Sequence, residues 1–402
     1  MADLWNRKNA PKIAMIYGHN PRWDSSEAEL MEAAKFDLII AGFKIDDSRE
    51  HIEKLNDNLK KLHEYNDRLI VVSYIAGSCE YFPGTKYFDD DCFLKTTDGN
   101  NINSWPGSQL LNLSKEKTLK SYMNLIEDKW PSMLNVDGVY IDCMGGSFDS
   151  WAVELESKKK VKIDANEDGK EDSIDDLNRL WVKGKETILK ETRKRYGNEP
   201  YILINGSMES DYALDYADGT IFEGILDHIS LPENFTKYTF DDIMNKYIPW
   251  GKSATGKPNC TYIDVTPGFD VEFGHMMKRP VEESCRYLEK GYSNLKNMRF
   301  GLACALLGDG HYTYQMHTKW LGNHWWYHEY DIPVGKPLGA YYKDEDDTYK
   351  REYENAVVAL NNTFHDTMVH FDKRMRDETT GMEGNDFFLG SKDGRIYIRC
   401  GL

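Results

Sequence analysis

The stretch VDGVYIDCMGG, residues 136–146, contains the pattern that decides the fold. An apolar run rich in β-branched and aromatic residues ends at Ile141, and an acidic residue follows it at once. Similar runs recur with amphipathic stretches between them, which is typical of parallel strands that alternate with helices. We expect eight such strands, at residues 12–17, 38–43, 69–74, 136–141, 201–204, 220–222, 261–263 and 311–314.

Eight repeats of this length predict a (β/α)8 TIM barrel of the α/β class, which has about 250 residues before insertions. The extra length falls in two insertions, at residues 76–113 and 144–176. Both follow strand ends, on the face where barrels build active sites. A doubly wound open sheet is the alternative, but no glycine-rich phosphate loop follows the first strand, which ends YGHNPRW (residues 17–23).

The C-terminal part of the chain has a different sequence pattern. We expect the barrel to occupy residues 1–330 and a small C-terminal β region to occupy residues 331–402. Short alternating runs broken by Gly, Asn and Asp fill roughly the last 50 residues, as in an antiparallel β unit. The unit is too small for a large core of its own, so we expect it to pack on the barrel.

Composition excludes several classes of partner. The chain has 50 basic and 67 acidic side chains and a formal net charge of −17, which argues against nucleic acid because phosphate binding depends on clustered Lys and Arg. No apolar run approaches the roughly 18 residues of a membrane span. Seven scattered cysteines show no zinc spacing and are interpreted mostly as small buried residues.

The strongest local motif is IDANEDGKEDSIDDL, residues 163–177. Its oxygen-bearing side chains have the spacing of a Ca²⁺ loop, with Gly169 at the position of the sharp turn. The position-12 residue is Asp rather than the Glu of an EF-hand, a departure shared with dockerin loops. The sequence therefore predicts a structural, dockerin-like Ca²⁺ site, and the alternative is an acidic, solvated loop. The predicted ligand set is Asp164, Asn166, Asp168, Lys170, Asp172 and Asp175.

Acidic residues end three of the predicted strands: Asp142, Glu223 and Asp264. In a barrel these positions converge on one mouth. Glycoside cleavage needs two carboxyl groups, one as acid and the other as nucleophile or base, about 5 to 10 Å apart. Each residue alone could cap the following helix instead. Together they favour Asp142 and Glu223 as a catalytic pair, with Asp264 bonding substrate hydroxyls or orienting Glu223.

Aromatic and neutral polar residues at the other strand ends suit a sugar site, because aromatic faces stack on sugar rings while Asn and His bond hydroxyls. For any single Trp, a buried or anchoring role is the commoner alternative. The predicted substrate-binding residues, besides Asp264, are Tyr17, His19, Tyr74, Trp105, Asn205 and Tyr312.

Other chemistries lack their motifs. There is no HExxH or comparable histidine pair for zinc, and no GxSxG for a serine hydrolase. A deacetylase or lyase would need a metal triad or a Tyr/Arg base that the sequence does not show. A barrel that binds carbohydrate without cleaving it remains a second interpretation.

Several blocks together resemble a family of TIM-barrel proteins described as hypothetical glycosyl hydrolase family fifteen. They are DGVYIDCMGG, IDANEDGKEDSID, ILINGS, GTIFEGI, ALLGDGHYTY, WWYHEYDIPVGKPLG and YKREYENAVVALNNT, in that order. His328 stands where we expect an acid, and Ala356 where glycine is usual. The resemblance implies a carbohydrate-active barrel with a C-terminal β unit and leaves Asp142 and Glu223 matched.

We therefore expect a glycoside hydrolase with a retaining mechanism, in which Asp142 is the nucleophile and Glu223 the general acid/base. The placement of these two residues after the fourth and sixth strands is similar to that of the catalytic residues in barrels that cleave α-linked sugars. Only this analogy supports an α-linked oligo- or polysaccharide as the substrate. Calcium and polysaccharide chemistry suit a location outside the cell. The first 12 residues lack the apolar core of a signal peptide, so either export depends on a segment outside this sequence or the protein works inside a cell.

Overall fold

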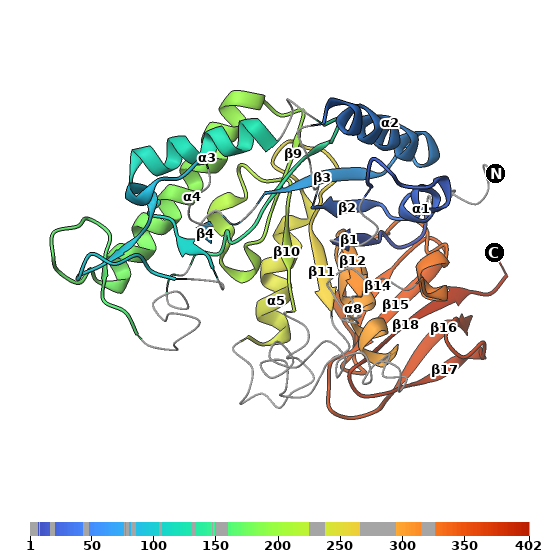
Figure 1. The fold of residues 1–402 in the computed structure, drawn as a ribbon. Helices are drawn as coiled ribbons and strands as arrows, with labels where there is room; N and C mark the ends of the chain where they lie inside the picture. The colour runs from blue at the N-terminus through green and yellow to red at the C-terminus, as the bar shows by residue number, and fades with distance from the viewer. Residues whose placement is uncertain are drawn as a thin grey trace, which may run out of the picture.

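The computed structural model describes most of the chain (Figure 1). Eight parallel strands form one sheet in the order β1-β2-β3-β7-β9-β10-β11-β12. The described residues are 7, 9–16, 21–42, 48–75, 77, 80–81, 86–103, 107–129, 134–146, 148, 160–224, 238–265, 295–314 and 326–401. The strands are β1 Ala14–Ile16, β2 Leu38–Ala41, β3 Ile70–Ile75, β7 Gly138–Ile141, β9 Tyr201–Ile204, β10 Gly219–Phe222, β11 Tyr262–Val265 and β12 His311–Tyr314.

The sheet closes on itself. A parallel bridge pairs Ile13 with Tyr312, and the main-chain N–H of Tyr312 donates to the carbonyl of Lys12 at 2.9 Å. The last strand is therefore joined to the residues directly before the first. This confirms the predicted barrel and all eight predicted strands, and it excludes the open doubly wound sheet.

Alternate residues of each strand point to opposite sides of the sheet. One set of buried side chains fills the barrel interior, among them Ile40, Val72, Leu203 and Tyr262. The other set faces the surrounding helices and joins the main core. Because the strands are buried on both faces, they are apolar throughout, as expected for a parallel sheet.

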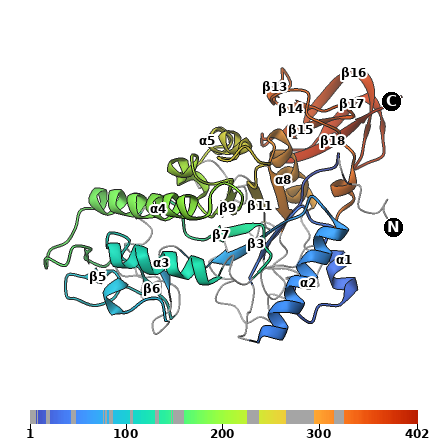
Figure 2. The same ribbon diagram turned by 90° about the horizontal axis from the view of Figure 1, so that it is seen from above.

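Helices cover the outside of the barrel (Figures 1 and 2). Three begin at capping serines: Ser26 accepts the N–H of Glu29, Ser48 accepts that of His51, and Ser173 accepts that of Asp176. The helices are α1 Glu27–Ala33, α2 Arg49–Tyr65, α3 Glu116–Lys129, α4 Ile174–Tyr196, α5 Phe240–Tyr247 and α8 Leu295–Leu307.

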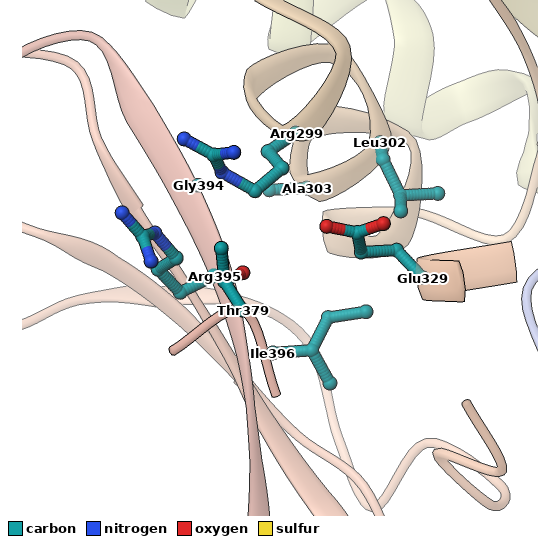
Figure 3. A pocket seen from close by; sticks show the side chains of 8 residues that line it. All are labelled: Arg299, Leu302, Ala303, Glu329, Thr379, Gly394, Arg395 and Ile396. Carbon is teal, nitrogen blue, oxygen red and sulfur yellow. The ribbon is translucent and has the colours of Figure 1, made fainter. Parts of the chain in front are cut away.

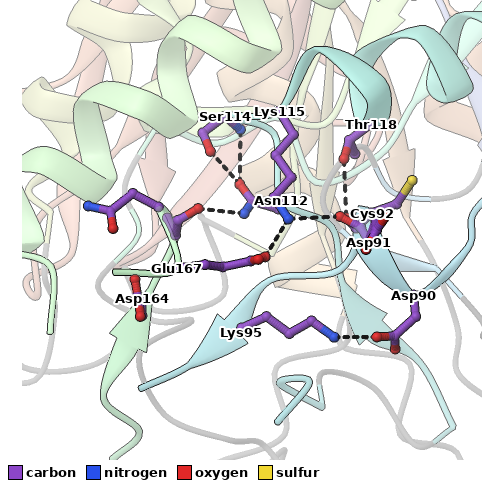
Figure 4. Close-up of polar contacts among 12 residues, drawn as sticks. Asp90, Asp91, Cys92, Lys95, Asn112, Ser114, Lys115, Thr118, Asp164 and Glu167 are labelled. Atoms are coloured by element: carbon purple, nitrogen blue, oxygen red, sulfur yellow. Dashed lines mark hydrogen bonds and ion pairs between the residues drawn. The ribbon is translucent and has the colours of Figure 1, made fainter. Parts of the chain in front are cut away.

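The two insertions pair with each other, which the sequence did not indicate. Strand β5 (Lys95–Thr96) of the first insertion lies antiparallel to β8 (Ile163–Asp164) of the second. Within the first insertion, β4 (Glu80–Tyr81) pairs with β6 (Gln109–Leu110). The Asn112 amide donates to the carbonyl of Ala165 at 2.8 Å, and Lys115 forms an ion pair with Glu167 (Figure 4). The insertions thus form one lobe, at the end of the molecule opposite the C-terminal sheet (Figure 2).

The C-terminal residues form a six-stranded antiparallel sheet in the order β13-β14-β15-β18-β16-β17. Its last four strands fall within the C-terminal residues where short alternating runs predicted an antiparallel unit, whereas β13 and β14 lie before them. The boundary expected at residues 330 and 331 falls between β12 and this sheet. The strands are β13 Tyr342–Lys343, β14 Tyr349–Glu352, β15 Ala356–Asn361, β16 Thr367–Asp377, β17 Glu383–Leu389 and β18 Asp393–Arg399.

This sheet packs on helix α8 through β18. Gly394 lies so close to α8 that an added Cβ would collide with the Ala303 side chain and the Arg299 carbonyl. Arg299 forms two hydrogen bonds with Asp393, each 3.0 Å long. A cavity of about 10 Å³ remains at this interface, enough for roughly one water molecule and too small for a sugar (Figure 3). Its lining residues are Arg299, Leu302, Ala303, Glu329, Thr379, Gly394, Arg395 and Ile396.

Three aspartates stand directly before strands at the N-terminal end of the barrel. Asp37, Asp137 and Asp218 accept main-chain N–H groups of Ile13, Val71 and Ile202, at 2.9, 2.7 and 3.0 Å. Each carboxylate thereby satisfies a donor at the start of the neighbouring strand. Each also has a basic partner. These are Arg7 for Asp37, His63 for Asp137 and Arg193 for Asp218.

Within the described ranges, no helix combines the length and the apolarity needed to cross a bilayer. The five described cysteines are free thiols.

Replacing Asp218 tests the role of these aspartates in stability. Asp218 is 0% exposed, and its loss leaves the Arg193 guanidinium buried without its carboxylate. We expect Asp218→Ala to lower the free energy of unfolding by about 3–5 kcal/mol, measured by urea denaturation. Glu53→Ala, which breaks an exposed pair with Arg49, is the control and should change it by less than about 1 kcal/mol. Equal effects of the two variants would contradict this account.

Candidate functional site

Polar side chains replace apolar ones where the strands reach the mouth of the barrel. Tyr140, Leu203, Ile221 and Tyr262 belong to the interior core. Two residues further along each strand, the same inward face carries Asp142, Asn205, Glu223 and Asp264. The alternation of side chains along the strands thus places residues that are distant in sequence on the same inward face. The first and last of them, Asp142 and Asp264, are 122 residues apart.

Asp142 is held by three hydrogen bonds. The Tyr74 hydroxyl donates to its Oδ2 at 2.7 Å, while the Asn205 amide and the Cys143 N–H donate to its Oδ1 at 2.9 and 2.8 Å. These hydrogen bonds fix the orientation of the carboxylate, which a nucleophile requires.

The segment after Asp142 has an unusual conformation. Cys143 has a φ of 57°, in the left-handed region that residues other than glycine rarely adopt. This turn directs the Cys143 N–H back to the Asp142 carboxylate. Backbone strain of this kind occurs often at active sites.

Side chains from behind the mouth hold this segment in place. The Lys185 ammonium donates to the carbonyl of Gly145 at 2.6 Å, and the Tyr212 hydroxyl donates to the carbonyl of Met144 at 2.8 Å. Lys185 is fully buried and its ammonium lies 4.7 Å from the Trp181 ring centroid. Lys185 belongs to α4, and Tyr212 to the short 3-10 turn Asp211–Ala213 that follows β9. Neither was predicted, because no local motif marks them.

Asn205 lies between the two candidate catalytic carboxylates. Its Nδ2 atom donates to Asp142 Oδ1 at 2.9 Å and to Glu223 Oε2 at 2.7 Å. Two oxygens bonded to one nitrogen at these distances are at most about 5.6 Å apart. The nearest oxygens of the two carboxyl groups are therefore close, as the roughly 5–5.5 Å between the carboxyl groups of retaining glycosidases would require.

Glu223 has a different environment from Asp142. Its side chain reaches solvent at the mouth, yet the surrounding protein disfavours its charged form. Desolvation, followed by the nearby negative charge of Asp142, raises the pKa of Glu223, and the hydrogen bond from Asn205 partly opposes this. A carboxyl group with a raised pKa can hold a proton that its neighbour has lost.

Asp264 is the third candidate carboxylate. It follows Ile263, which pairs with Phe222, the residue before Glu223. Asp264 is only 3% exposed, so little of its surface is open to a ligand.

The structure corrects the prediction for Tyr312. Its side chain is 1% exposed and belongs to the outer core, and its hydroxyl donates to the carbonyl of Met298 in α8 at 2.8 Å. The strand alternation turns Tyr312 away from the mouth, so it cannot contact a substrate there. Three further predicted binding residues, Tyr17, His19 and Trp105, lie outside the described residues.

The predicted calcium loop has an ordered backbone. The buried Asp164 carboxylate accepts the N–H groups of Asp168 and Gly169 at 3.1 and 2.7 Å. Gly169 has a φ of 82°, as the sharp turn requires. Asp172 accepts the N–H of Ala165 at 2.6 Å. Among the described residues, no group of three or more His, Cys, Asp or Glu side chains is arranged to hold a metal ion.

Comparison with solved structures relates the chain to barrels of known fold. A maltogenic amylase from S. marinus has a TM-score of 0.50 and 10% identity, over 99% of this chain and 68% of that one. An α-galactosidase from Geobacillus stearothermophilus in complex with stachyose has a TM-score of 0.49 and 9% identity, over 98% of this chain and 56% of that one. A debranching enzyme from Nostoc punctiforme has a TM-score of 0.47 and 12% identity, over 97% and 98%. Identities this low show likeness of fold alone.

Comparison with curated proteins finds no match. A family model described as hypothetical glycosyl hydrolase family 15 matches residues 63–357, which include the strands that carry Tyr74, Asp142, Asn205 and Glu223. The barrel is glycoside hydrolase-like, and the chain belongs to hypothetical glycosyl hydrolase family 15.

Proposed function

We propose that the protein is a glycoside hydrolase that cleaves an oligo- or polysaccharide with retention of configuration. The observation that carries the proposal is the pair of carboxylates, Asp142 and Glu223, joined by one amide nitrogen at the mouth of the barrel. The short distance between their nearest oxygens supports direct displacement by a carboxylate rather than by a water molecule placed between them. A barrel that only binds carbohydrate is less well supported, because binding alone does not require this spacing.

In the first step, an Asp142 oxygen attacks the anomeric carbon and the bond to the glycosidic oxygen breaks. Glu223 donates its proton to that oxygen, so that the leaving sugar departs as an alcohol. In the second step, Glu223 accepts a proton from water, whose oxygen attacks the anomeric carbon and displaces Asp142. Both carboxyl groups then regain their starting states.

The environments of the two carboxyl groups suit these roles. Tyr74, Asn205 and Cys143 all donate to Asp142 and hold its carboxylate in a fixed orientation, which supports it as the nucleophile. The raised pKa of Glu223 supports it as the proton donor. We assign an α-linked substrate from the placement of the pair after the fourth and sixth barrel strands, by analogy with barrels that cleave α-linked sugars.

Substitution of either carboxylate tests the proposal. We expect Asp142→Asn and Glu223→Gln each to lower kcat by about 10³-fold or more on natural glycans. Substrates would come from a panel of polysaccharides and aryl glycosides, with products identified by mass spectrometry. Glu127→Gln, which changes an exposed carboxylate paired with Arg195, is the control and should keep full activity. Normal rates in both site variants would show that the assignment is wrong.

The pH dependence provides a second test. Because Glu223 must be protonated to act as the acid, activity should fall as the pH rises through its raised pKa. We expect the basic limb of the kcat/KM profile to lie well above 4.5, the ordinary pKa of a glutamate side chain. With an aryl glycoside whose leaving group needs no protonation, Glu223→Gln should retain glycosylation and lose this limb. A basic limb that survives in this variant would assign the acid to another residue.

We also propose that residues 164–175 bind a structural Ca²⁺ ion. The donor set supports this: it is rich in carboxylate oxygen, which Ca²⁺ prefers, and Gly169 has the backbone conformation of a calcium-loop turn. No group of three acidic side chains is preformed among the described residues, so binding would draw the exposed carboxylates inward. Since Asp164 belongs to strand β8, which pairs with β5, the ion would stabilise both insertions.

Calcium removal and return tests this site. After treatment with a chelator, Ca²⁺ at 100 times its Kd should stabilise the fold by about 2.7 kcal/mol, seen as a rise in Tm and as heat in calorimetric titration. Asp168→Ala should abolish the calcium-dependent rise, and Asp98→Ala, an exposed residue of the neighbouring insertion, should not. No heat at millimolar Ca²⁺ would overturn the proposal.

A further inference from the structure

Asn205 donates two hydrogen bonds from one nitrogen to two different carboxylates. A side-chain amide nitrogen has two N–H groups and no acceptor capacity. Both donors of Asn205 are therefore engaged with Asp142 and Glu223. Only the amide oxygen is left to meet a substrate hydroxyl, so substrate binding, the role expected from the sequence, does not explain this geometry.

The main chain fixes Asn205 from both sides. Its N–H donates to the carbonyl of Ile141 at 3.0 Å, and its own carbonyl accepts the N–H of Met144 at 2.6 Å. The next residue, Gly206, donates to the Thr220 hydroxyl at 3.2 Å. Because Asn has only two side-chain torsions, an anchored backbone leaves its amide with little freedom. Asn205 thus connects the strands that carry both carboxylates.

We propose that Asn205 is a positioning residue that fixes the separation and orientation of Asp142 and Glu223 for the two reaction steps. This inference rests on the proposed function. The bridge places a partial positive charge between two groups that repel each other when both are charged. Asp could not replace Asn205, because a third carboxylate would repel Asp142 and Glu223. An apolar residue at this position would leave the two carboxylates without a shared hydrogen-bond donor.

The surroundings of Glu223 shift its pKa in known directions. Desolvation raises the pKa of Glu223, charge repulsion by Asp142 raises it further, and the Asn205 hydrogen bond lowers it. Tyr74 reaches Asp142 from β3. The carboxylate of Glu223 accepts its hydrogen bond from Asn205 at 2.7 Å. Loss of the amide should therefore move the titration of Glu223 to higher pH.

The experiment compares the wild-type protein with Asn205→Leu, which has the same branching at Cγ and no donor. Carboxyl-carbon NMR of protein labelled with ¹³C-glutamate follows the titration of Glu223, with the resonance assigned by its absence in Glu223→Gln. We expect the Glu223 midpoint to rise by about half a unit or more in Asn205→Leu. Asn205→Ser, with a short side chain that cannot span both carboxylates, should give a shift in the same direction if the leucine variant does not fold.

Kinetics then separate the possible roles. A positioning role predicts a fall in kcat of about 10²-fold or more with a smaller change in KM, and a basic limb shifted to higher pH. The proposal would be overturned in favour of substrate binding if the midpoint of the Glu223 titration did not change. A raised KM with the same kcat and the same pH–rate profile would overturn it as well. The NMR titration needs no turnover, so an inactive wild-type protein would contradict the proposed function without obscuring the result for Asn205.

Discussion

Closure of the eight-stranded sheet is the constraint on which the rest of the structure depends. The Tyr312 N–H meets the Lys12 carbonyl at 2.9 Å and joins the last strand to the start of the first. Closure leaves the barrel without free strand edges and fixes which residues face inward. The apolar interior therefore ends in a ring of polar side chains, and Asp142 and Glu223 meet although β9 lies between their strands.

The arrangement of this ring gives two chemically similar side chains different properties. From the described part of the chain, Asp142 receives three hydrogen bonds, whereas Glu223 receives one and lies near the negative charge of Asp142. Asn205 is the shared element, because its amide contacts both groups. The site is further supported from the helix layer, where the buried Lys185 holds the Gly145 carbonyl. Rigid support of this kind is what a reaction that depends on carboxylate spacing requires.

The strands could be predicted from the sequence because burial on both faces makes each one a continuous apolar run, ended by a polar residue such as Asp142 or Asn205. Tyr312 was misplaced because its own strand is short and the side it faces depends on register, which only the closed barrel fixes. The roles of Lys185 and Asn205 could not be predicted, since they arise from contacts between distant segments. The pairing of the two insertions was missed for the same reason.

The central claim is that Asp142 forms a bond to the sugar. Mechanism-based inactivators of retaining glycosidases, such as activated fluoro-sugars of a cleaved substrate, test this directly through intact mass and peptide mapping. The account predicts one sugar bound per chain, on the peptide that contains Asp142, and products of retained configuration. A label on another carboxylate, or hydrolysis with inversion of configuration, would contradict it.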